Sequence, residues 1–362
     1  MNPAYSYGRG KNRRMGGVKD FIYSLMTDKK NGFFYGILKF KLYLVSLIYG
    51  LAIRGRKIFY KLGIFKTKRV GLKVVSVGNI TLGGTGKTPF VVTLAHILEK
   101  ELKKSVCVLI RGYGWDEQAM LKAKLTDVPV LVGEDRARSA LKAVKLYGSN
   151  TAVLDDGFQH WELARDLDIV LIDSRNPFGN SQLFPRGILR EPTRSLERAD
   201  LIVFTKADKA KKDLNVLQDE IKKINKDALF LQARHKPTHL YENRTKRAYD
   251  LSYIKGRRIM LLSSIGDPDY FEETVKGLGA DIVEHIKFSD HHNYKKSDIE
   301  YILKRCSERS FDLVLTTEKD IVKLSRLGLS LGPYTVLVVA IKLDIISGKE
   351  TLVDRLNRLY IG

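Results

Sequence analysis

The chain has 362 residues, enough for two domains with hydrophobic cores, and its apolar content of 44% predicts a globular protein. Its two cysteines, Cys107 and Cys306, give neither a disulfide framework nor zinc-site spacing, which excludes a disulfide-stapled secreted domain. The formal net charge is +22, and residues 1–70, with sixteen Lys or Arg and two Asp or Glu, carry +14 of it. Such a segment is typical of proteins that bind an anionic membrane or a nucleic acid.

The N-terminus is expected to form a disordered basic tail over residues 1–14 and a basic, amphipathic helical segment over residues 15–73. Within it, an uncharged and mostly apolar run is flanked by basic residues: Leu42–Ile53 lies between Lys39, Lys41 and Arg54, Arg56, Lys57. Twelve residues of helix span about 18 Å, less than the ~30 Å hydrocarbon core of a bilayer. The segment is therefore predicted to lie in the membrane interface; the alternative is a core helix with solvated basic ends.

From Val74 the pattern changes to short apolar runs separated by turns, which predicts a parallel sheet with helices on both faces. The predicted fold class is α/β, with a P-loop domain over residues 74–233. Its strands are expected at residues 74–77, 105–110, 152–154, 169–172 and 200–205, and its helices at 89–100 and 137–147.

A polar, irregular stretch at residues 234–247 is interpreted as a linker to a smaller second α/β domain over residues 248–342. The strands of this domain are expected at residues 259–263, 281–286, 312–315 and 335–340, and its helices at 269–277 and 297–307. Residues 343–362 are expected to form a C-terminal tail or helix.

The strongest motif is a glycine-rich loop between a predicted strand and a predicted helix. Glycines let backbone amides approach phosphate oxygens, and the helix N-terminus adds positive potential. Lys87 is expected to reach the β- and γ-phosphates of a nucleoside triphosphate, and Thr88 to hold Mg²⁺. All eight loop residues are candidate nucleotide ligands: Thr81, Leu82, Gly83, Gly84, Thr85, Gly86, Lys87 and Thr88. The strict motif begins with glycine, where this chain has Thr81.

Two adjacent carboxylates, Asp155 and Asp156, end a later apolar strand. In P-loop proteins a second strand brings an acid to the nucleotide-bound magnesium ion, so these two are candidate metal ligands. The alternative is that Asp-Asp-Gly forms only a turn, but the nearby Gln159 and His160 favour a functional site.

Two further motifs are weaker evidence for a functional site. Asp290-His291-His292 follows a predicted strand; a histidine beside a carboxylate can accept a proton, but the motif also fits a capping turn or a metal ligand pair. Thr205-Lys-Ala-Asp208 matches the guanine-reading motif of GTPases except that its first residue is not Asn.

Seven motifs in order make the chain resemble the tetraacyldisaccharide 4′-kinases, the lipid A 4′-kinases of Gram-negative bacteria. The matching segments are Gly78–Pro89, Arg111–Gly114, Asp155–His160, Phe184–Pro192, Gly266–Pro268, Asp290–His292 and Thr316–Asp320. The resemblance implies an ATP- and Mg²⁺-dependent lipid kinase. It would transfer the γ-phosphoryl group to the 4′-hydroxyl of a lipid A disaccharide 1-phosphate. The family also lacks the first glycine of the strict motif, so Thr81 is no obstacle.

The resemblance also implies a place in the cell and a set of partners. The family enzyme is a peripheral protein on the cytoplasmic face of the bacterial inner membrane and anchors through its N-terminal helix. Its expected partners are the lipid A disaccharide 1-phosphate and the anionic membrane surface, with no nucleic acid and no obligate protein partner.

Site residues follow from the same resemblance. Lys87 and Thr88 would bind phosphate and metal, and three residues would belong to the metal and γ-phosphate site: Asp155, Asp156 and His160. Arg190 and Glu191 would lie near the nucleotide or the acceptor.

The catalytic pair of the family combines a histidine with a carboxylate. His291, oriented by Asp290, is the expected histidine. The family has Gly-Asp-Glu-Pro where this chain reads Gly-Glu-Asp-Arg, so either Glu134 or Asp135 supplies the partner carboxylate, with Glu134 in the aligned position.

Two other classes of protein remain open from the residues. One is a membrane-associated P-loop GTPase or ATPase switch that reads guanine through Thr205–Asp208. The other is a basic nucleic-acid-binding ATPase, against which the apolar run at Leu42–Ile53 and the absence of a nucleic-acid-binding motif argue.

Overall fold

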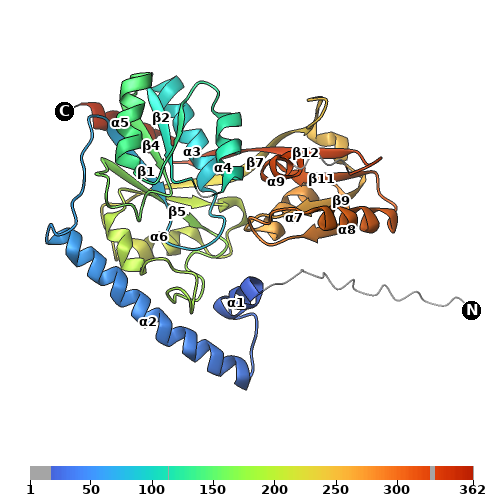
Figure 1. Ribbon diagram of the computed structural model, residues 1–362, viewed down its shortest axis with the longest axis horizontal. Coiled ribbons are helices and arrows are strands. Elements are labelled where there is room, and N and C mark those ends of the chain that lie inside the picture. The colour runs from blue at the N-terminus through green and yellow to red at the C-terminus, as the bar shows by residue number, and fades with distance from the viewer. Residues whose placement is uncertain (1–17, 113, 327–330, 362) are drawn as a thin grey trace, which may run out of the picture. The chain divides into compact units, whose positions relative to one another are not determined.

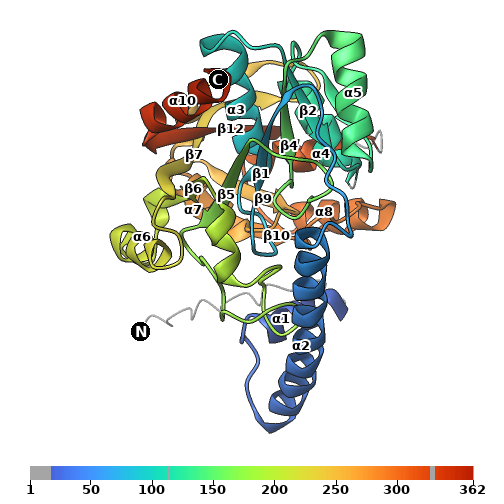
Figure 2. The ribbon, with the colours of Figure 1, turned by 90° about the vertical axis from the view of Figure 1, so that its left-hand side faces the viewer.

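The computed structural model describes residues 18–112, 114–326 and 331–361, so the expected basic tail of residues 1–14 lies outside the described residues. Strands and helices alternate along most of the chain (Figure 1). Helices α3 (Lys87–His96) and α5 (Arg136–Tyr147) flank strands β1 (Lys73–Gly78) and β4 (Thr151–Asp155) on opposite sides (Figure 2). This arrangement confirms the predicted α/β fold class.

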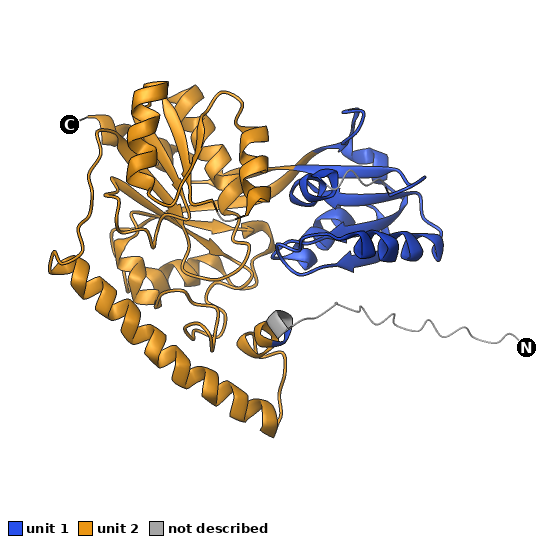
Figure 3. Ribbon diagram, viewed as in Figure 1, with its two compact units in different colours: residues 1–21, 239–340 blue, residues 22–238, 341–362 orange. Residues whose placement is uncertain are grey.

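The chain divides into two compact units (Figure 3). Unit 2 consists of Ile22–Thr238 and Ile341–Gly362, and unit 1 of Met1–Phe21 and His239–Ala340. Two long strands, β7 (Leu229–Glu242) and β12 (Val336–Ser347), carry the chain from one unit to the other.

Unit 2 is built on a parallel sheet in the order β7-β6-β5-β1-β4-β2-β3. Its remaining strands are β2 (Val106–Ile110), β3 (Val130–Val132), β5 (Leu167–Asp173) and β6 (Leu201–Thr205). Every residue of β2, β4 and β6 is buried, as expected for strands covered on both faces. The sheet is covered by α3 on one face and by α5 and α6 (Leu214–Lys222) on the other, and α4 (Trp115–Lys124) adds Leu121 to the core of the α3 face.

Unit 1 contains the parallel strands β9 (Arg258–Ser263), β10 (Asp281–Lys287), β11 (Leu313–Thr317) and the first part of β12, in the order β10-β9-β11-β12. Its helices are α7 (Pro268–Gly277), α8 (Lys296–Ser307) and α9 (Glu318–Arg326). One hydrophobic cluster, which includes Met260, Ile302 and Val314, joins α8 and α9 to the sheet.

The stretch at residues 234–247 is not an irregular linker. Most of it is strand, because β7 continues to Glu242 and its end pairs with the short antiparallel β8 (Ala248–Tyr249). Pro237 lies beyond Leu229–Gln232, the part of β7 that pairs with β6, so its missing N–H costs no hydrogen bond to that strand. Polar residues and proline are typical of loops, which is why the sequence did not predict this strand.

The N-terminal segment forms α1 (Val18–Met26) and α2 (Phe33–Lys61). With 29 residues α2 is about 43 Å long, so the length estimated from the uncharged run is wrong. The helix continues through the flanking basic residues because Lys and Arg are good helix formers. Among the described residues, α2 is the one helix that is long and apolar enough to cross a membrane, judged by length and composition alone.

The C-terminal segment folds back onto unit 2. After β12 the chain turns at Gly348 and forms α10 (Lys349–Asn357), whose Leu352 and Leu356 are fully buried in the same cluster as α3. The hydroxyl groups of Tyr360 and Thr151 share a hydrogen bond of 2.6 Å. The last residues thus complete one face of the unit 2 core.

This packing predicts the effect of truncating Leu356. Leu356→Ala removes a fully buried side chain and leaves a cavity, so we expect unit 2 to lose about 2–5 kcal/mol of unfolding free energy. The matched control is Leu146→Ala on α5, where the side chain is 57% exposed. Urea unfolding of both variants tests this; equal stability would show that α10 is not part of the unit 2 core.

Candidate active site

The glycine-rich loop Thr81–Thr88 connects β1 to α3, as its sequence requires. Gly83 and Gly86 have φ angles of 109° and 84°, a region that side chains other than glycine rarely adopt. At Gly86 a Cβ atom would also lie 2.7 Å from His235 Nε2. The loop leads into the N-terminus of the ten-residue helix α3, where backbone N–H groups and the helix dipole favour an anion.

Buried side chains hold the loop from behind. Asn79 Nδ2 donates to Thr85 Oγ1 at 3.0 Å, and Thr205 Oγ1 donates to the Thr85 carbonyl at 2.9 Å. Thr205 begins the guanine-like motif, but the next residue, Lys206, is only 1% exposed and forms an ion pair with Asp173. In this chain the motif contributes to the scaffold under the loop.

Asp155 and Asp156 lie beside the loop because β4 pairs with β1, with Asp155 opposite Val77. Burial, followed by the charge of Glu117, raises the pKa of the Asp155 carboxyl to about 7. Its Oδ1 atom is buried and accepts no hydrogen bond from any described residue. A buried carboxylate oxygen without a donor is a fitting ligand for a cation.

Asp156 is instead surrounded by positive charge. Arg190 binds it with both nitrogens of the guanidinium group, at 2.7 and 3.0 Å, and Lys87 Nζ lies 3.6 Å from its Oδ1 atom. Burial alone would raise the pKa of Asp156, but Lys87 and Arg190 outweigh it and hold the pKa well below its usual range. Asp156 is thus ionised, and it fixes Lys87 at the mouth of the loop.

His160 follows the two acids on the same loop. Burial, together with Arg136 and Arg165, lowers the pKa of its imidazole to about 4. The ring is therefore neutral at neutral pH, and it can donate and accept a hydrogen bond without adding charge.

The residues at this edge of the sheet fit a magnesium ion bound together with a nucleotide. Mg²⁺ takes few protein ligands, usually a hydroxyl and one or two carboxylates, and keeps several waters. Thr88, 9% exposed on the first turn of α3, and the unbonded Oδ1 of Asp155 supply such a set. Within the described residues no cluster of three or more His, Cys, Asp or Glu side chains forms a separate metal site.

Arg190 and Glu191 differ in what they contact. The guanidinium group of Arg190 reaches Asp156 and also donates to Asn79 Oδ1 at 3.1 Å. Glu191 is 3% exposed and binds Arg198 through both carboxylate oxygens, at 3.0 and 3.1 Å. Arg190 therefore belongs to the loop site, whereas the Glu191 carboxylate braces the segment that carries Arg190.

The structure distinguishes the two acids that sequence left as alternatives. Asp135 is the N-cap of α5: its side chain accepts a hydrogen bond from Arg138 N at 2.9 Å and forms an ion pair with Lys68 at 3.3 Å. The Arg138 N–H, more than any other group, lowers the pKa of the Asp135 carboxyl. Glu134, one residue earlier, is exposed on the loop between β3 and α5.

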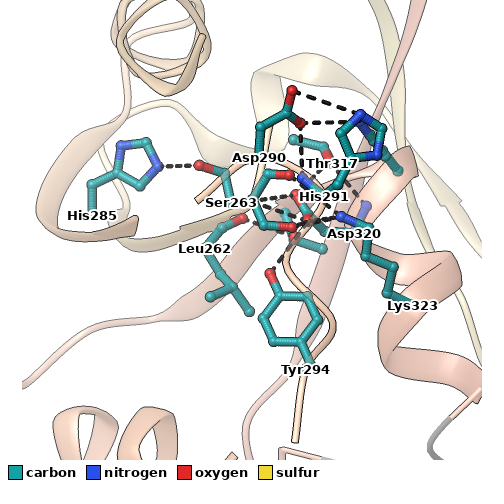
Figure 4. A network of polar contacts seen from close by, with 12 residues as sticks. Leu262, Ser263, His285, Asp290, His291, Tyr294, Thr317, Asp320 and Lys323 are labelled. Carbon is teal, nitrogen blue, oxygen red and sulfur yellow. Dashed lines mark hydrogen bonds and ion pairs between the residues drawn. The ribbon is translucent and has the colours of Figure 1, made fainter. Parts of the chain in front are cut away.

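In unit 1, Asp290 and His291 lie on the loop after β10 (Figure 4). Asp290 Oδ2 is 3.8 Å from His291 Nε2, too far for a hydrogen bond. Lys319 stands between them: its Nζ atom donates to Asp290 Oδ1 at 3.0 Å and lies 3.2 Å from His291 Nε2. The sequence predicted the neighbouring acid but not the lysine that binds both residues.

A buried polar network supports this loop (Figure 4). Asp320 is fully buried and accepts hydrogen bonds from Ser264 N at 3.0 Å, Thr317 Oγ1 at 2.7 Å and Tyr294 Oη at 3.2 Å. Burial, and then the charge of Asp320, raises the pKa of Tyr294, which stays protonated and keeps donating. The network ties the loop to the ends of β9 and β11.

The comparisons with known proteins decide the family. The family model for "Tetraacyldisaccharide-1-P 4'-kinase" matches residues 38–115 and 115–360, almost the whole described chain. This chain belongs to that family.

Individual relatives agree with this assignment. The tetraacyldisaccharide 4′-kinase of Syntrophus aciditrophicus is 37% identical over 310 residues, covering 77% of this chain and 83% of the relative. That of Elusimicrobium minutum is 36% identical over 340 residues, covering 86% and 89%. The crystal structure of "apo" form LpxK from Aquifex aeolicus in complex with ATP superposes with a TM-score of 0.69 at 28% identity, covering 89% of this chain and 99% of that chain.

The sequence did not predict three contacts of this site. Asn79 braces the glycine-rich loop, Arg136 donates to the Asp155 carbonyl at 3.0 Å, and Lys319 binds Asp290. Asn79 and Lys319 lie inside the matching motifs, and Arg136 directly follows Asp135, so their position in the sequence was a usable signal.

The opposite environments of the two acids predict opposite pH effects on the kinase without metal. The raised pKa of Asp155 means that its contribution to stability is present below about pH 4 and is lost as the pH rises through about 7. We therefore expect Asp155→Asn to raise the melting temperature by several degrees at pH 8, and the difference to shrink towards pH 4.

Asp156→Asn is the matched control with the opposite sign. The depressed pKa of Asp156 contributes stability above about pH 4, so this variant should melt at a lower temperature at pH 8. Thermal unfolding from pH 4 to 8 with a chelator measures both variants. A destabilised Asp155→Asn protein at pH 8 would contradict the assigned environment of Asp155.

Proposed function

We propose that this protein transfers the γ-phosphoryl group of ATP to the 4′-hydroxyl of a tetraacylated lipid A disaccharide 1-phosphate, giving the bisphosphorylated lipid IVA. The observation that carries the proposal is the group formed by Lys87, Asp156 and Arg190 beside the glycine-rich loop of a chain in this family. ATP is the nucleotide in the related solved structure, which supports ATP as the donor.

Binding of the triphosphate depends on unit 2. The N–H groups of the loop and of the first turn of α3 would cradle the phosphates, and Lys87 would neutralise the transferred group. Asp156 binds both Lys87 and Arg190, so two cations are in place before the nucleotide arrives. Positioned charge of this kind supplies most of the catalysis in phosphoryl transfer.

Magnesium fits this scheme as a second source of positive charge. Thr88 and Asp155 would hold it, and it would neutralise charge on the β- and γ-phosphates. Because the pKa of Asp155 is about 7 without metal, the carboxyl would release a proton when a cation binds at or below that pH. His160, neutral at this pH, would hydrogen-bond to phosphate or to metal-bound water.

Proton removal from the acceptor hydroxyl is assigned to His291. Lys319 Nζ donates to Asp290 Oδ1 at 3.0 Å and lies 3.2 Å from the His291 Nε2 atom, so it holds the imidazole beside the carboxylate. Of the two neighbouring acids of unit 2, we assign Glu134 as the catalytic carboxylate, because Asp135 is already engaged as the cap of α5. Arg190 and Glu191 serve the nucleotide site differently: Arg190 by its charge, and Glu191 by holding the segment that carries Arg190.

Membrane association is assigned to α2. Its buried residues are few, Ser46 and Gly50, and the apolar side chains that it leaves 45–89% exposed are Phe33, Phe34, Ile37, Phe40, Leu44, Val45, Leu47, Ile48, Leu51 and Ile58. A helix attached to unit 2 along one side and apolar on the other suits a peripheral protein that lies on the bilayer. Because ATP is a cytoplasmic substrate, the proposed location is the cytoplasmic face of the inner membrane.

The kinase assignment predicts a lipid product that depends on Lys87. Incubation with labelled ATP, Mg²⁺ and a tetraacylated disaccharide 1-phosphate in mixed micelles should give a bisphosphorylated lipid. Lys87→Ala should lower turnover at least about 100-fold, because a charge that neutralises the transferred group is lost. The control Lys142→Ala, exposed on α5, should keep its rate. No lipid product from the wild type would refute the proposed function.

The membrane assignment predicts that two exposed residues of α2 carry binding. Replacing Ile48 and Leu51, 68% and 63% exposed, by Ser should weaken binding to phosphatidylglycerol vesicles about tenfold or more, because both side chains lose their apolar contact with lipid. The control pair is Leu141 and Leu146 on α5, 58% and 57% exposed, each replaced by Ser. Vesicle flotation measures both; equal loss in the two pairs would argue against α2 as the membrane contact.

A further inference from the structure

A short segment of unit 2 separates α2 from the glycine-rich loop. We call residues 182–190 the arch. Its two ends are closed by backbone hydrogen bonds from Leu189 N to the Gln182 carbonyl at 3.1 Å and from Phe184 N to the Leu189 carbonyl at 2.8 Å. These bonds make the arch a compact element, so that a shift of its outer side also moves its inner side.

The inner side of the arch binds the nucleotide loop. Leu82 N donates to the Ile188 carbonyl at 2.7 Å, and Arg190 N donates to the Ile80 carbonyl at 2.7 Å. From the same residue the Arg190 side chain reaches Asp156 with two hydrogen bonds. The position of the Arg190 backbone therefore sets the position of the guanidinium group, which shares Asp156 with Lys87.

The outer side of the arch binds α2 over a narrow area. Tyr49 Oη donates to the Arg190 carbonyl at 2.9 Å, and its ring meets the Phe184 ring edge-on with centroids 5.7 Å apart. Next to it Gly50 is buried against Leu183; a Cβ atom at Gly50 would lie 3.0 Å from Leu183 Cδ1. The Tyr49 hydroxyl thus joins the proposed membrane helix to the backbone of the residue that holds Asp156.

We propose that Tyr49 is a positioning residue that links the lipid-bound state of α2 to the nucleotide site through the Arg190 carbonyl. The inference rests on the proposed function for its lipid surface and its nucleotide. Tyr49 touches neither substrate; it acts by fixing the Arg190 backbone and, through it, the guanidinium group at Asp156.

A lipid surface has a physical reason to favour this contact. Under this proposal, orientations of α2 that hide its apolar face compete in water with the orientation in which that face is exposed. A bilayer stabilises the exposed orientation, and this is the orientation in which Tyr49 reaches Arg190. Because linkage is reciprocal, the same surface tightens nucleotide binding, and the nucleotide tightens binding to the surface.

The test measures nucleotide affinity with and without a membrane that contains no acceptor. The full chain is titrated with a nonhydrolysable ATP analogue and Mg²⁺, in buffer and on phosphatidylglycerol vesicles. We expect vesicles to tighten wild-type binding about fivefold, the effect of one neutral hydrogen bond. In Tyr49→Phe this vesicle effect should disappear, while binding to the vesicles themselves persists.

Two further variants sharpen the result. Tyr43→Phe makes the same chemical change on the same helix, at a side chain that is 40% exposed, and should keep the fivefold effect. Gly50→Ala places a methyl group 3.0 Å from Leu183 Cδ1, so that either this side chain or α2 must shift, and should weaken the effect. With the lipid acceptor, Tyr49→Phe should lower kcat about fivefold and leave the KM for the acceptor unchanged.

Each outcome separates the proposal from the function on which it rests. A vesicle effect that persists in Tyr49→Phe, or that is absent from the wild type, overturns the link. In both cases the formation of the bisphosphorylated lipid by the wild type is tested separately, by the kinase assay.

Discussion

The ion pair between Arg190 and Asp156 is the interaction on which the nucleotide site depends. Asp156 has a left-handed φ of 51° at the end of a fully buried strand, where an unpaired carboxylate would be costly. Arg190 binds both of its oxygens, and Lys87 adds a second cation. Two positive charges around one negative charge leave a net positive site at the mouth of the loop, which is what a triphosphate requires.

The same arginine connects the site to the surface of the molecule. Its side chain points to the loop, its N–H binds Ile80, and its carbonyl receives the hydroxyl group of Tyr49. Helix α2 therefore has two functions in one element: a narrow buried stripe that holds the arch, and a wide apolar face that remains exposed. A helix with only the buried stripe would be a core helix, and a helix with only the apolar exposed face would have no contact with the arch.

Unit 1 combines a buried polar network with an exposed loop that carries the proposed catalytic residues. Asp320 and Tyr294 are buried and fully engaged, whereas Asp290 and His291 stand on the loop above them. His291 has a φ of 57°, a strained conformation for a residue other than glycine, and strain of this kind persists only where the surroundings enforce it. The Asp290 carboxylate accepts the His291 N–H at 3.0 Å, and Lys319 contacts both side chains.

The sequence by itself determined the fold class, the glycine-rich loop and the acid pair. Phosphate geometry dictates the spacing of the loop residues, and buried parallel strands leave unmistakable apolar runs, so both are local signals. Only the tertiary structure decided that residues 234–242 are strand, that Asp135 rather than Glu134 caps α5, and that Tyr49 meets Arg190. Tyr49 and Arg190 are 141 residues apart, and no local pattern can encode a contact made by the packing of distant segments.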